Sequence, residues 1–227
     1  MLITLKNISK SYQNPGNNLW QEVLTEISLE IKPGDSLAIS GPSGSGKSTL
    51  LNIIGTLDQP TSGNISFDGI DLNSFSQNQL AAFRNRHIGF VFQQHFLLPQ
   101  LSLLENVLLP VIPVKDKTRR KAATTSATEL LREVGLADKM HHLPGQLSGG
   151  ECQRGTVVRA MINEPGLILA DEPTGSLDQA SAEQIGELLS EINKKKIVTL
   201  ILVTHSEKLA SKMDQVYKIV GGRLLRS

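Results

Sequence analysis

Hydrophobic and polar side chains alternate near the start of the chain. Over residues 2–8 and 24–31 the apolar positions recur so that one face of an extended segment is buried, which predicts two strands. A Pro33-Gly34 turn signal follows, and Ser36–Ser40 has the apolar centre of a short buried strand. The chain therefore begins with β structure.

Strand and helix patterns alternate over the rest of the chain. Short apolar runs predict further strands at residues 64–67, 88–92, 167–170 and 198–203. Longer stretches of helical character lie at residues 50–57, 150–163 and 180–195. This alternation predicts an α/β fold with a mostly parallel sheet, and residues 58–63 are expected to form a loop.

The pattern of apolar and polar residues changes between residues 95 and 147. This segment is first punctuated by prolines and then has apolar side chains close to helical spacing from Ala122 to Val134, ending at Gly135. We expect a helical insertion between two strands of the sheet.

Composition excludes several classes of protein. With 23 basic and 22 acidic side chains among 227 residues, the net charge of +1 gives no electrostatic footprint for nucleic acid, and we expect no nucleic-acid partner. One cysteine excludes an internal disulfide framework and indicates a reducing compartment. Lys6 and Lys10 argue against a signal peptide, and no apolar run approaches the roughly 18–20 residues of a membrane span. We expect a cytoplasmic protein that reaches a membrane only through a partner.

A glycine-rich loop carries the first candidate chemistry. It lies between a predicted strand and a predicted helix and fits the pattern G-x-x-x-x-G-K-[ST], in which backbone N–H groups curl around a phosphate. The lysine adds a charge for the outer phosphates, and the final hydroxyl is placed for Mg²⁺. The residues that fit the pattern are Gly41, Pro42, Ser43, Gly44, Ser45, Gly46, Lys47 and Ser48.

Two acids end the apolar run at residues 167–170. Asp171 at the strand tip can hold Mg²⁺ through its water shell, as in P-loop NTPases. Glu172 is the candidate to polarise an attacking water. The alternative is a strand that simply ends in solvated acids, which the neighbouring phosphate loop makes a minor interpretation.

A third motif opens a predicted helix. Residues 147–154 read LSGGECQR, a polar turn whose helix N-terminus is a second anion-binding point with no phosphate of its own. With this motif, with GPSGSGKST ending at Thr49 and with LILADEPTGSLD, the sequence resembles the ATP-binding cassette (ABC) ATPases over essentially its whole length.

The resemblance implies a fold and a division of the chain. The fold is α/β, a P-loop NTPase (RecA-like) core with an N-terminal antiparallel β-subdomain and an inserted α-helical subdomain. Residues 1–227 are expected to be a single ABC ATPase domain, with the core and β-subdomain at about 1–94 and 151–227. The helical subdomain is expected at about 95–150.

The resemblance also implies roles for single residues. Tyr12 matches the aromatic side chain that stacks on adenine, and His205 matches the histidine that touches the γ-phosphate. Gln93 matches the glutamine that senses Mg²⁺ and the attacking water. ATP and Mg²⁺ are thus the implied ligands. The implied metal ligands are Ser48, Gln93 and Asp171, and the implied catalytic residues are Gln93, Glu172 and His205.

A second subunit is implied as well. Ser148 and Gly150 match positions that contact the γ-phosphate of an ATP held by the other subunit, and Asp178 matches the aspartate that communicates across that interface. Two chains in head-to-tail pairing would hold two ATP molecules between them, and hydrolysis would open the dimer.

The third motif departs from the family pattern after Glu151. Cys152 stands where Gln or Arg is common, and Gly155-Thr156 where Val-Ala is common. Cys152 is expected to be a packing residue, and Gly155 inside a helix is expected to cost about 1 kcal/mol relative to alanine.

Further segments resemble the lipoprotein-releasing and macrolide-exporter branch of the family. They are residues 51–63, 84–93, 96–99 and 104–107. Members pair with membrane permease subunits, so we expect a stand-alone ATPase at the cytoplasmic face of the inner membrane, held there by its membrane subunit. The transported substrate and the stoichiometry of the complex are not written in the sequence.

Other functions remain open at this point. Drug or peptide export and mechanotransmission of the cell-division type, in which no substrate moves, fit the same sequence. DNA-repair and chromosome-organising ATPases share the third motif, but they require a long coiled-coil insertion that is not present between Lys47 and Ser148.

Two segments, one apolar and one basic, each allow two interpretations from the sequence. The apolar side chains of residues 96–104 are expected either to join the core or to form a groove for a short helix of the membrane subunit. The basic cluster at 115–121 is expected to be a solvated surface, although a lipid or partner contact is an alternative.

Overall fold

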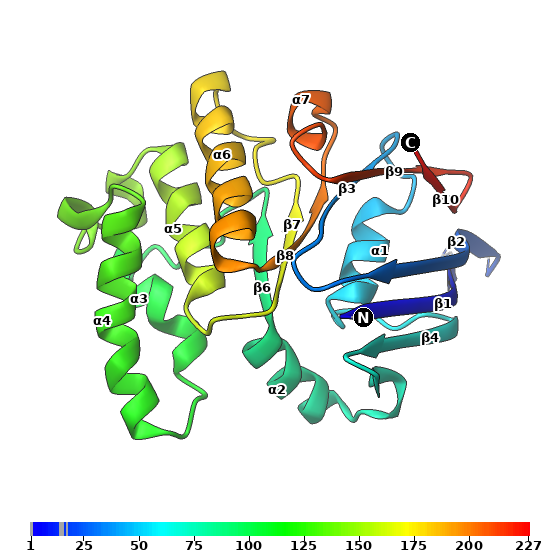
Figure 1. Cartoon of the computed structure of the whole chain (residues 1–227), viewed down its shortest axis with the longest axis horizontal. Helices are drawn as coiled ribbons and strands as arrows, with labels where there is room; N and C mark the ends of the chain where they lie inside the picture. Colours follow the sequence, from blue (N-terminus) through cyan, green and yellow to red (C-terminus); the bar gives the residue numbers. More distant parts are fainter. Residues whose placement is uncertain (1, 14–15, 17) are drawn as a thin grey trace.

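An antiparallel sheet forms one side of the structure. The computed structural model describes residues 2–13, 16 and 18–227. The sheet has the strand order β2-β1-β4-β5 and lies on the right of Figure 1. Its strands are β1 (Ile3–Gln13), β2 (Trp20–Ile31), β4 (Ser62–Phe67) and β5 (Ile70–Asp71).

A second, six-stranded sheet carries the candidate site. Its order is β10-β9-β3-β8-β7-β6, and only the edge strand β10 pairs antiparallel, so the prediction of a mostly parallel sheet is confirmed. The strands are β3 (Ser36–Ser40), β6 (Ile88–Phe92), β7 (Leu167–Asp171), β8 (Thr199–Val203), β9 (Gln215–Val220) and β10 (Arg223–Arg226).

Helices surround this sheet, and three of them stand apart as a group. α3, α4 and α5 lie together at one end of the molecule, the left side in Figure 1. The α-helices are α1 (Lys47–Ile54), α2 (Gln77–His87), α3 (Leu103–Leu108), α4 (Lys117–Glu133), α5 (Gly149–Met161), α6 (Gln179–Lys196) and α7 (Glu207–Ala210). Short 3-10 turns are η1 (Leu72–Ser74), η2 (Leu109–Val111), η3 (Ala137–Lys139) and η4 (Pro144–Gln146).

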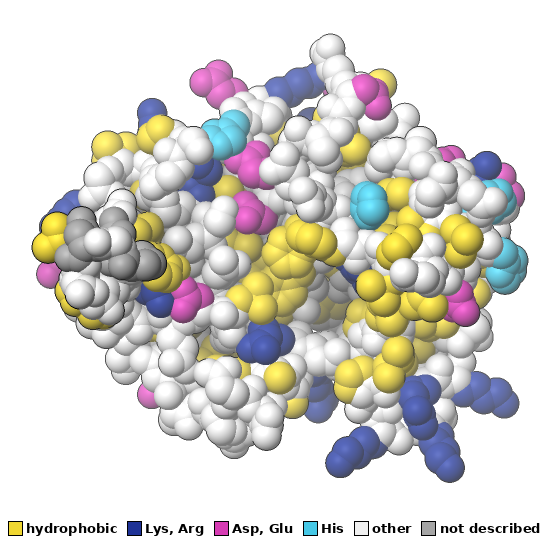
Figure 2. Space-filling model, turned by 180° about the vertical axis from the view of Figure 1, so that it is seen from behind, with side chains coloured by type: hydrophobic (Ala, Val, Ile, Leu, Met, Phe, Trp, Pro, Cys, Tyr) yellow, Lys and Arg dark blue, Asp and Glu magenta, His cyan; other side chains and the backbone are white. Residues whose placement is uncertain are grey.

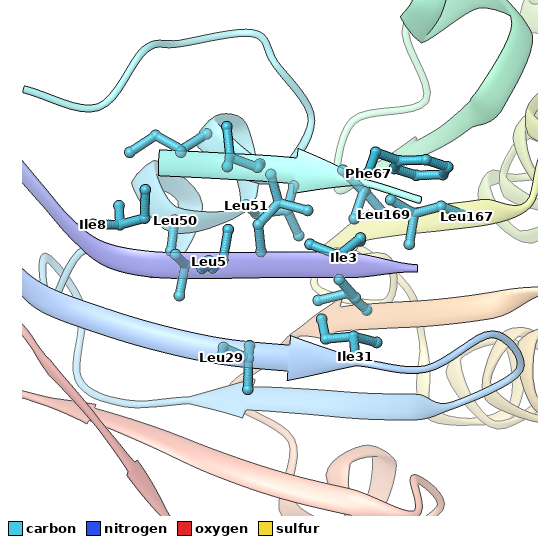
Figure 3. Close-up of a cluster of buried hydrophobic side chains, with 14 of the residues drawn as sticks. Ile3, Leu5, Ile8, Leu29, Ile31, Leu50, Leu51, Phe67, Leu167 and Leu169 are labelled. Atoms are coloured by element: carbon cyan, nitrogen blue, oxygen red, sulfur yellow. The ribbon is translucent and has the colours of Figure 1, made fainter. Parts of the chain in front are cut away.

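The central strands β7 and β8 are mostly apolar because both faces of the sheet are buried there. In β7, Leu167 and Leu169 point into a cluster with α1 and the antiparallel sheet (Figure 3), whereas Ile168 and Ala170 point into a second cluster with α5 and α6. A third cluster fills the helical group, so the predicted helical insertion between β6 and β7 has a core of its own.

Several element boundaries differ from the sequence prediction. The first helix begins at Lys47, directly in the phosphate loop, and ends at Ile54. Ser62 and Gly63, predicted as loop, belong to β4 because they pair with β1. α2, β9 and β10 were not predicted at all.

The departures in the third motif have a packing explanation. Cys152 is buried in the helical cluster, and burial raises the pKa of its thiol, so it is a packing residue as expected. Gly155 lies where α5 meets α3, and a Cβ added there would stand 2.5 Å from Leu103 Cδ1. Leu103 is fully buried and has little room to move.

We therefore expect Gly155→Ala to destabilise the protein, although alanine is the better helix former. The overpacking against Leu103 costs about 1–3 kcal/mol, which exceeds the gain of about 1 kcal/mol in helix propensity. Urea unfolding measures the sign. Adding Leu103→Val, which shortens the clashing side chain, should make the Gly155→Ala change less costly. A more stable Gly155→Ala variant would show that propensity outweighs packing here.

Candidate active site

The glycine-rich loop joins β3 to α1 and ends in a helix without a side-chain cap. Gly41 (φ 146°) and Gly46 (φ 99°) hold backbone angles that other residues rarely adopt, and a Cβ on Gly41 would meet the carbonyl of Ile219. Gly46 caps α1 with no side-chain hydrogen bond, whereas each of the other six α-helices in the described residues begins with a serine or aspartate cap. The first-turn N–H groups of α1 are thus left for an anion.

Lys47 and Ser45 show that the loop fits a polyanion. Lys47 is only 6% exposed, and its Nζ donates to the carbonyls of Gly41 (3.0 Å) and Pro42 (2.9 Å). The ammonium group therefore lies within the loop without a carboxylate partner among the described residues. Ser45 Oγ is buried and has no hydrogen-bond partner there. Phosphate oxygens would satisfy both groups.

Ser48 and Asp171 meet across the sheet. The Ser48 hydroxyl donates to Asp171 Oδ1 at 3.2 Å, although the two residues come from α1 and from the end of β7. Burial raises the pKa of Asp171, and the Ser48 hydrogen bond and the Lys47 charge offset part of this rise. A half-buried carboxylate beside a hydroxyl is a suitable oxygen donor set for a hard divalent cation.

Glu172 is held in a strained conformation beside His205. Its φ is 46°, and its N–H donates to the Val203 carbonyl at the end of β8. One carboxylate oxygen, Oε2, accepts from the His205 backbone N–H at 3.2 Å. The other, Oε1, is buried and accepts no hydrogen bond from the described residues, and His205 Nε2, 3.1 Å away, forms an ion pair with it when the imidazole is protonated. Oε1 is thus free to accept a proton.

Gln93 lies against the loop that follows Glu172. A Cβ on Gly175 would stand 3.0 Å from Gln93 Nε2, and the Ser176 hydroxyl donates to the Gln93 carbonyl at 3.1 Å. The absence of a side chain at Gly175 gives the Gln93 amide room at this position. The structure therefore places Gln93 beside the loop that follows Glu172.

A residue without a predicted role links these loops to α5. Gln153 is 2% exposed, and its Nε2 donates to the carbonyls of Phe92 and Pro173, both at 2.8 Å. Phe92 precedes Gln93, and Pro173 follows Glu172. Gln153 has polar neighbours in the sequence, Glu151 and Arg154, so nothing in the sequence sets it apart or reveals its partners.

Ser148, Gly150 and Asp178 lie together but apart from the phosphate loop. Ser148 caps α5, accepting from the Glu151 N–H, and Asp178 caps α6, accepting from the Ser181 N–H and hydroxyl. Hydrogen bonds from Ser181 hold the pKa of Asp178 below its usual value. A Cβ on Gly150 would meet Ser181 Oγ, so the two helix starts adjoin. Within the described residues, no hydrogen bond joins Ser148 or Gly150 to the phosphate loop.

Tyr12 lies beside α1 rather than within a closed pocket. The residue is 42% exposed, its hydroxyl donates to Asp58 Oδ2 at 2.6 Å, and the Thr49 side chain also interacts with the phenol. Tyr12 is thus placed next to the helix that begins in the phosphate loop.

The parallel sheet and the loop before α1 define a P-loop nucleoside triphosphatase. The sequence profile of the ABC transporter family matches residues 24–175, more than half of the chain. The chain belongs to the ABC transporter family, and the predicted class and ATP-hydrolysing activity are confirmed.

Individual relatives resemble the chain over different shares of their length. The lipoprotein-releasing system ATP-binding protein LolD of Syntrophus aciditrophicus is 46% identical over 224 residues, which are 99% of each chain. The macrolide export ATP-binding/permease protein MacB of Rhodopirellula baltica is 44% identical over 97% of this chain, but this spans only 32% of that protein.

Solved structures show the same fold. A dimeric bacterial ABC transporter cassette, MJ0796, is 40% identical and matches 98% of this chain and 96% of its own with a TM-score of 0.86. A post-hydrolysis dimer of MJ0796 bound to ADP and Pi has the same TM-score and is 38% identical. In residues 2–13, 16 and 18–227, no helix has the length and hydropathy needed to span a bilayer.

Proposed function

We propose that this chain is the ATPase subunit of a lipoprotein-releasing transporter, acting at the cytoplasmic face of the inner membrane with a separate permease. The observation that carries the proposal is the match to LolD proteins from several bacteria at 42–46% identity over 98–99% of this chain and 95–99% of theirs. The match to MacB supports the alternative of macrolide export less strongly than the LolD matches support lipoprotein release. The MacB relative is about three times longer than the region that this chain matches.

The geometry suits ATP hydrolysis with a bound Mg²⁺. Lys47 and the free amides of α1 would hold the outer phosphates, with the motif residues up to Thr49 completing the loop. Ser48, Asp171 and Gln93 would hold Mg²⁺, which neutralises the charge developing on the phosphates. Glu172 Oε1 would accept the proton of the attacking water, since it is the carboxylate oxygen that accepts no hydrogen bond from the described residues. His205, 3.1 Å from that oxygen, would orient it and contact the γ-phosphate.

A second copy would complete each site. Ser148 and Gly150 lie away from the phosphate loop of their own chain, at the N-terminus of α5, where the Ser148 hydroxyl accepts from the Glu151 N–H. In a head-to-tail dimer they would reach the γ-phosphate held by the partner subunit, with Asp178 beside them. The dimeric form of MJ0796, a relative of matching fold, supports this arrangement.

The membrane subunit is proposed to dock beside the segment after β6. The groove prediction fails for Leu97 and Leu103, which are buried in the helical cluster, but Phe96 (59%) and Leu98 (46%) are exposed. This segment runs along the back of the molecule in Figure 1, and the view from that side shows hydrophobic side chains gathered there (Figure 2). Buried Asn106 fixes the segment through hydrogen bonds to both the N–H and the carbonyl of Leu98.

A pocket adjoins this segment. It measures about 380 Å³ and lies between α2, β6 and α5. Its lining Phe92 packs edge-on against Phe96 at 5.6 Å, and the Arg159 guanidinium donates to the carbonyls of His95 and Phe96. The lining combines apolar side chains with the polar Arg84, Asn85, Arg159 and Asn163, which suits a short amphipathic helix. The basic residues of 115–121 are exposed, which agrees with a solvated surface.

We expect Leu98→Glu to abolish binding of the membrane subunit and its stimulation of ATP hydrolysis. Leu98 is exposed, so a buried charge is introduced only in the complex and not in the isolated chain. The ATP affinity of the purified variant should stay within about twofold, as for other surface substitutions. Pull-down from detergent extract and calorimetry measure the two effects. The control is Leu225→Glu in β10, also exposed, which should keep the partner. Normal partner binding by a folded Leu98→Glu variant would place the docking groove elsewhere.

A reconstituted complex tests whether lipoproteins are the transported substrates. The chain and its co-purifying membrane subunit are placed in lipid vesicles that contain a lipid-anchored protein, and release of that protein is followed with and without ATP. ATP-dependent release supports the proposal. ATP turnover without release, together with activation of an associated hydrolase, would favour mechanotransmission instead.

A further inference from the structure

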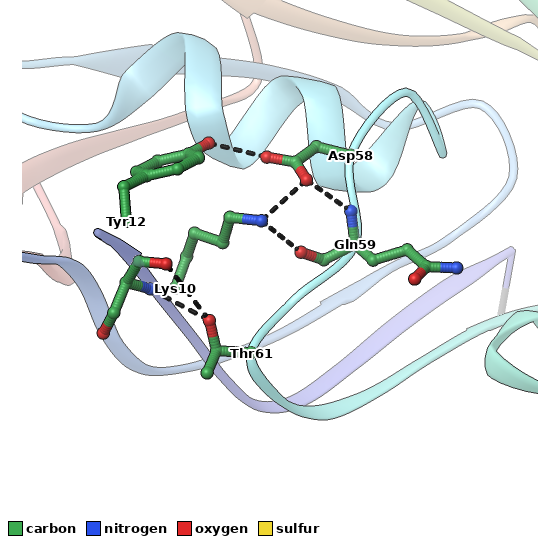
Figure 4. Close-up of polar contacts among 6 residues, drawn as sticks. Lys10, Tyr12, Asp58, Gln59 and Thr61 are labelled. Carbon is green, nitrogen blue, oxygen red and sulfur yellow. Dashed lines mark hydrogen bonds and ion pairs between the residues drawn. The ribbon is translucent and has the colours of Figure 1, made fainter. Parts of the chain in front are cut away.

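A polar cluster ties β1 to the loop after α1 (Figure 4). Lys10 Nζ donates to Asp58 Oδ1 at 2.6 Å and to the Gln59 carbonyl at 2.7 Å, and the Tyr12 hydroxyl donates to Asp58 Oδ2 at 2.6 Å. The Gln59 N–H donates to Asp58 Oδ1 as well. Asp58 thus accepts three hydrogen bonds from groups up to 48 residues away in the chain.

The charges in this cluster favour the observed bonds. Burial raises the pKa of Asp58, but hydrogen bonds from Lys10, Tyr12 and Gln59 outweigh it, and the pKa lies below its usual value. Burial and the neighbouring Asp58 raise the pKa of the Tyr12 phenol. The carboxylate therefore remains ionised and the phenol remains protonated, which is the pairing for a charge-assisted hydrogen bond.

The ring of Tyr12 is restrained at two further points. Lys10 Nζ lies over the ring at 4.7 Å from its centroid, so the cation covers one face. The Thr49 side chain contacts the phenol from α1. With 42% of the residue exposed, surface is left for a planar ligand. The Tyr12 hydroxyl and one face of its ring are thus both in contact with other groups of the protein.

We propose that Asp58 and Lys10 are positioning residues for the nucleotide base. They hold the Tyr12 ring beside the phosphate loop, in the orientation in which its free face stacks on adenine. The inference rests on the proposed ATPase function and on the adenine-stacking role that the resemblance to the ABC ATPases implies for Tyr12. A ring that is already fixed loses less conformational entropy when the base arrives, so the tether strengthens binding of the base without touching it. Neither residue contacts phosphate in this arrangement.

The test compares ATP with inorganic tripolyphosphate, which has the phosphates but no base. Tyr12→Phe keeps the ring and removes the hydroxyl that Asp58 holds. We expect its dissociation constant for ATP to rise about three- to tenfold, the range for freeing one side chain, while that for tripolyphosphate is unchanged. Asp58→Ala should give the same pattern. The double variant should bind ATP no more weakly than Asp58→Ala alone, since Asp58→Ala already removes the bond that the Tyr12 hydroxyl donates. KM for ATP should rise while kcat at saturation is kept.

A matched control is available in the same region. Thr61 Oγ1 accepts from the Ser11 N–H at 3.0 Å and so joins the same two segments without touching Tyr12 (Figure 4). Thr61→Val should therefore leave ATP affinity unchanged. An equal loss of ATP affinity in Thr61→Val, or an equal loss for ATP and tripolyphosphate in Tyr12→Phe, would show a general structural effect and overturn the inference.

One further variant separates this inference from the role of Tyr12 itself. Tyr12→Ala removes the ring and should weaken ATP binding more than Tyr12→Phe does. If Tyr12→Ala binds ATP like the wild type, the assignment of Tyr12 to adenine is wrong. If Tyr12→Ala binds weakly but Tyr12→Phe and Asp58→Ala bind normally, the assignment holds and only the positioning role of Asp58 is refuted.

Discussion

Glu172→Gln is expected to bind ATP normally and to hydrolyse it at least about a hundredfold more slowly, the usual loss for a catalytic base. Among the described residues no group donates a hydrogen bond to the carboxylate oxygen Oε1, and an amide in place of the carboxylate cannot take a proton from water. The shape of the side chain is kept, and glutamine can accept from the His205 N–H as the carboxylate does. Unhydrolysed ATP should then hold two subunits together.

Phosphate release gives the turnover, and size-exclusion chromatography with ATP detects the dimer. Adding Ser148→Arg to Glu172→Gln should abolish the dimer and leave ATP binding in place, because a bulky charge at the start of α5 would face the partner's nucleotide. Wild-type turnover in Glu172→Gln would remove Glu172 from its catalytic role. A dimer that survives Ser148→Arg would refute the proposed contact across the interface.

Lys47→Ala is expected to weaken ATP binding itself. The ammonium group is 6% exposed and lies within the phosphate loop, so it acts on the phosphates before any reaction begins. A hydrogen bond to a charged group contributes about 1.5–3 kcal/mol, so the dissociation constant should rise about ten- to a hundredfold.

Calorimetric titration with ATP measures this change. The loss of two bonds to loop carbonyls could also loosen the loop, so thermal unfolding of the nucleotide-free variant is the control. A variant with unaltered stability and weak ATP binding supports the assignment, whereas unaltered ATP affinity contradicts it.

The sequence was most informative where local pattern and chemistry coincide. Apolar strands, the loop of Gly41 to Ser48 and the acids after β7 could be found because each is a contiguous segment with its own signal. α2 was missed because only Leu80 and Phe83 face the core, which leaves weak periodicity. Its capping box, formed by Ser76 and Gln79, was the available signal. β9 and β10 could have been recognised from the two glycines that join them, Gly221 and Gly222.

The contacts between distant segments could not be predicted. Tyr12 and Asp58 meet because β1 passes beside the end of α1, and Ser48 meets Asp171 because β7 lies two strands from β3. Both pairings depend on strand order, which a single sequence does not determine. The same holds for the glycine at 155, whose cost in helix propensity was visible but whose contact with Leu103 was not.

The two bonds donated by Gln153 have a consequence for the pair of ATP sites. One amide group connects the first turns of α5 with the loop that begins at Gln93 and with the loop after Glu172. In the proposed dimer, the start of α5 contacts the nucleotide of the partner subunit, so a shift of this helix is felt by the catalytic loops of its own subunit. Each site would thereby report its occupancy to the other, and the two ATP molecules would be bound cooperatively rather than independently.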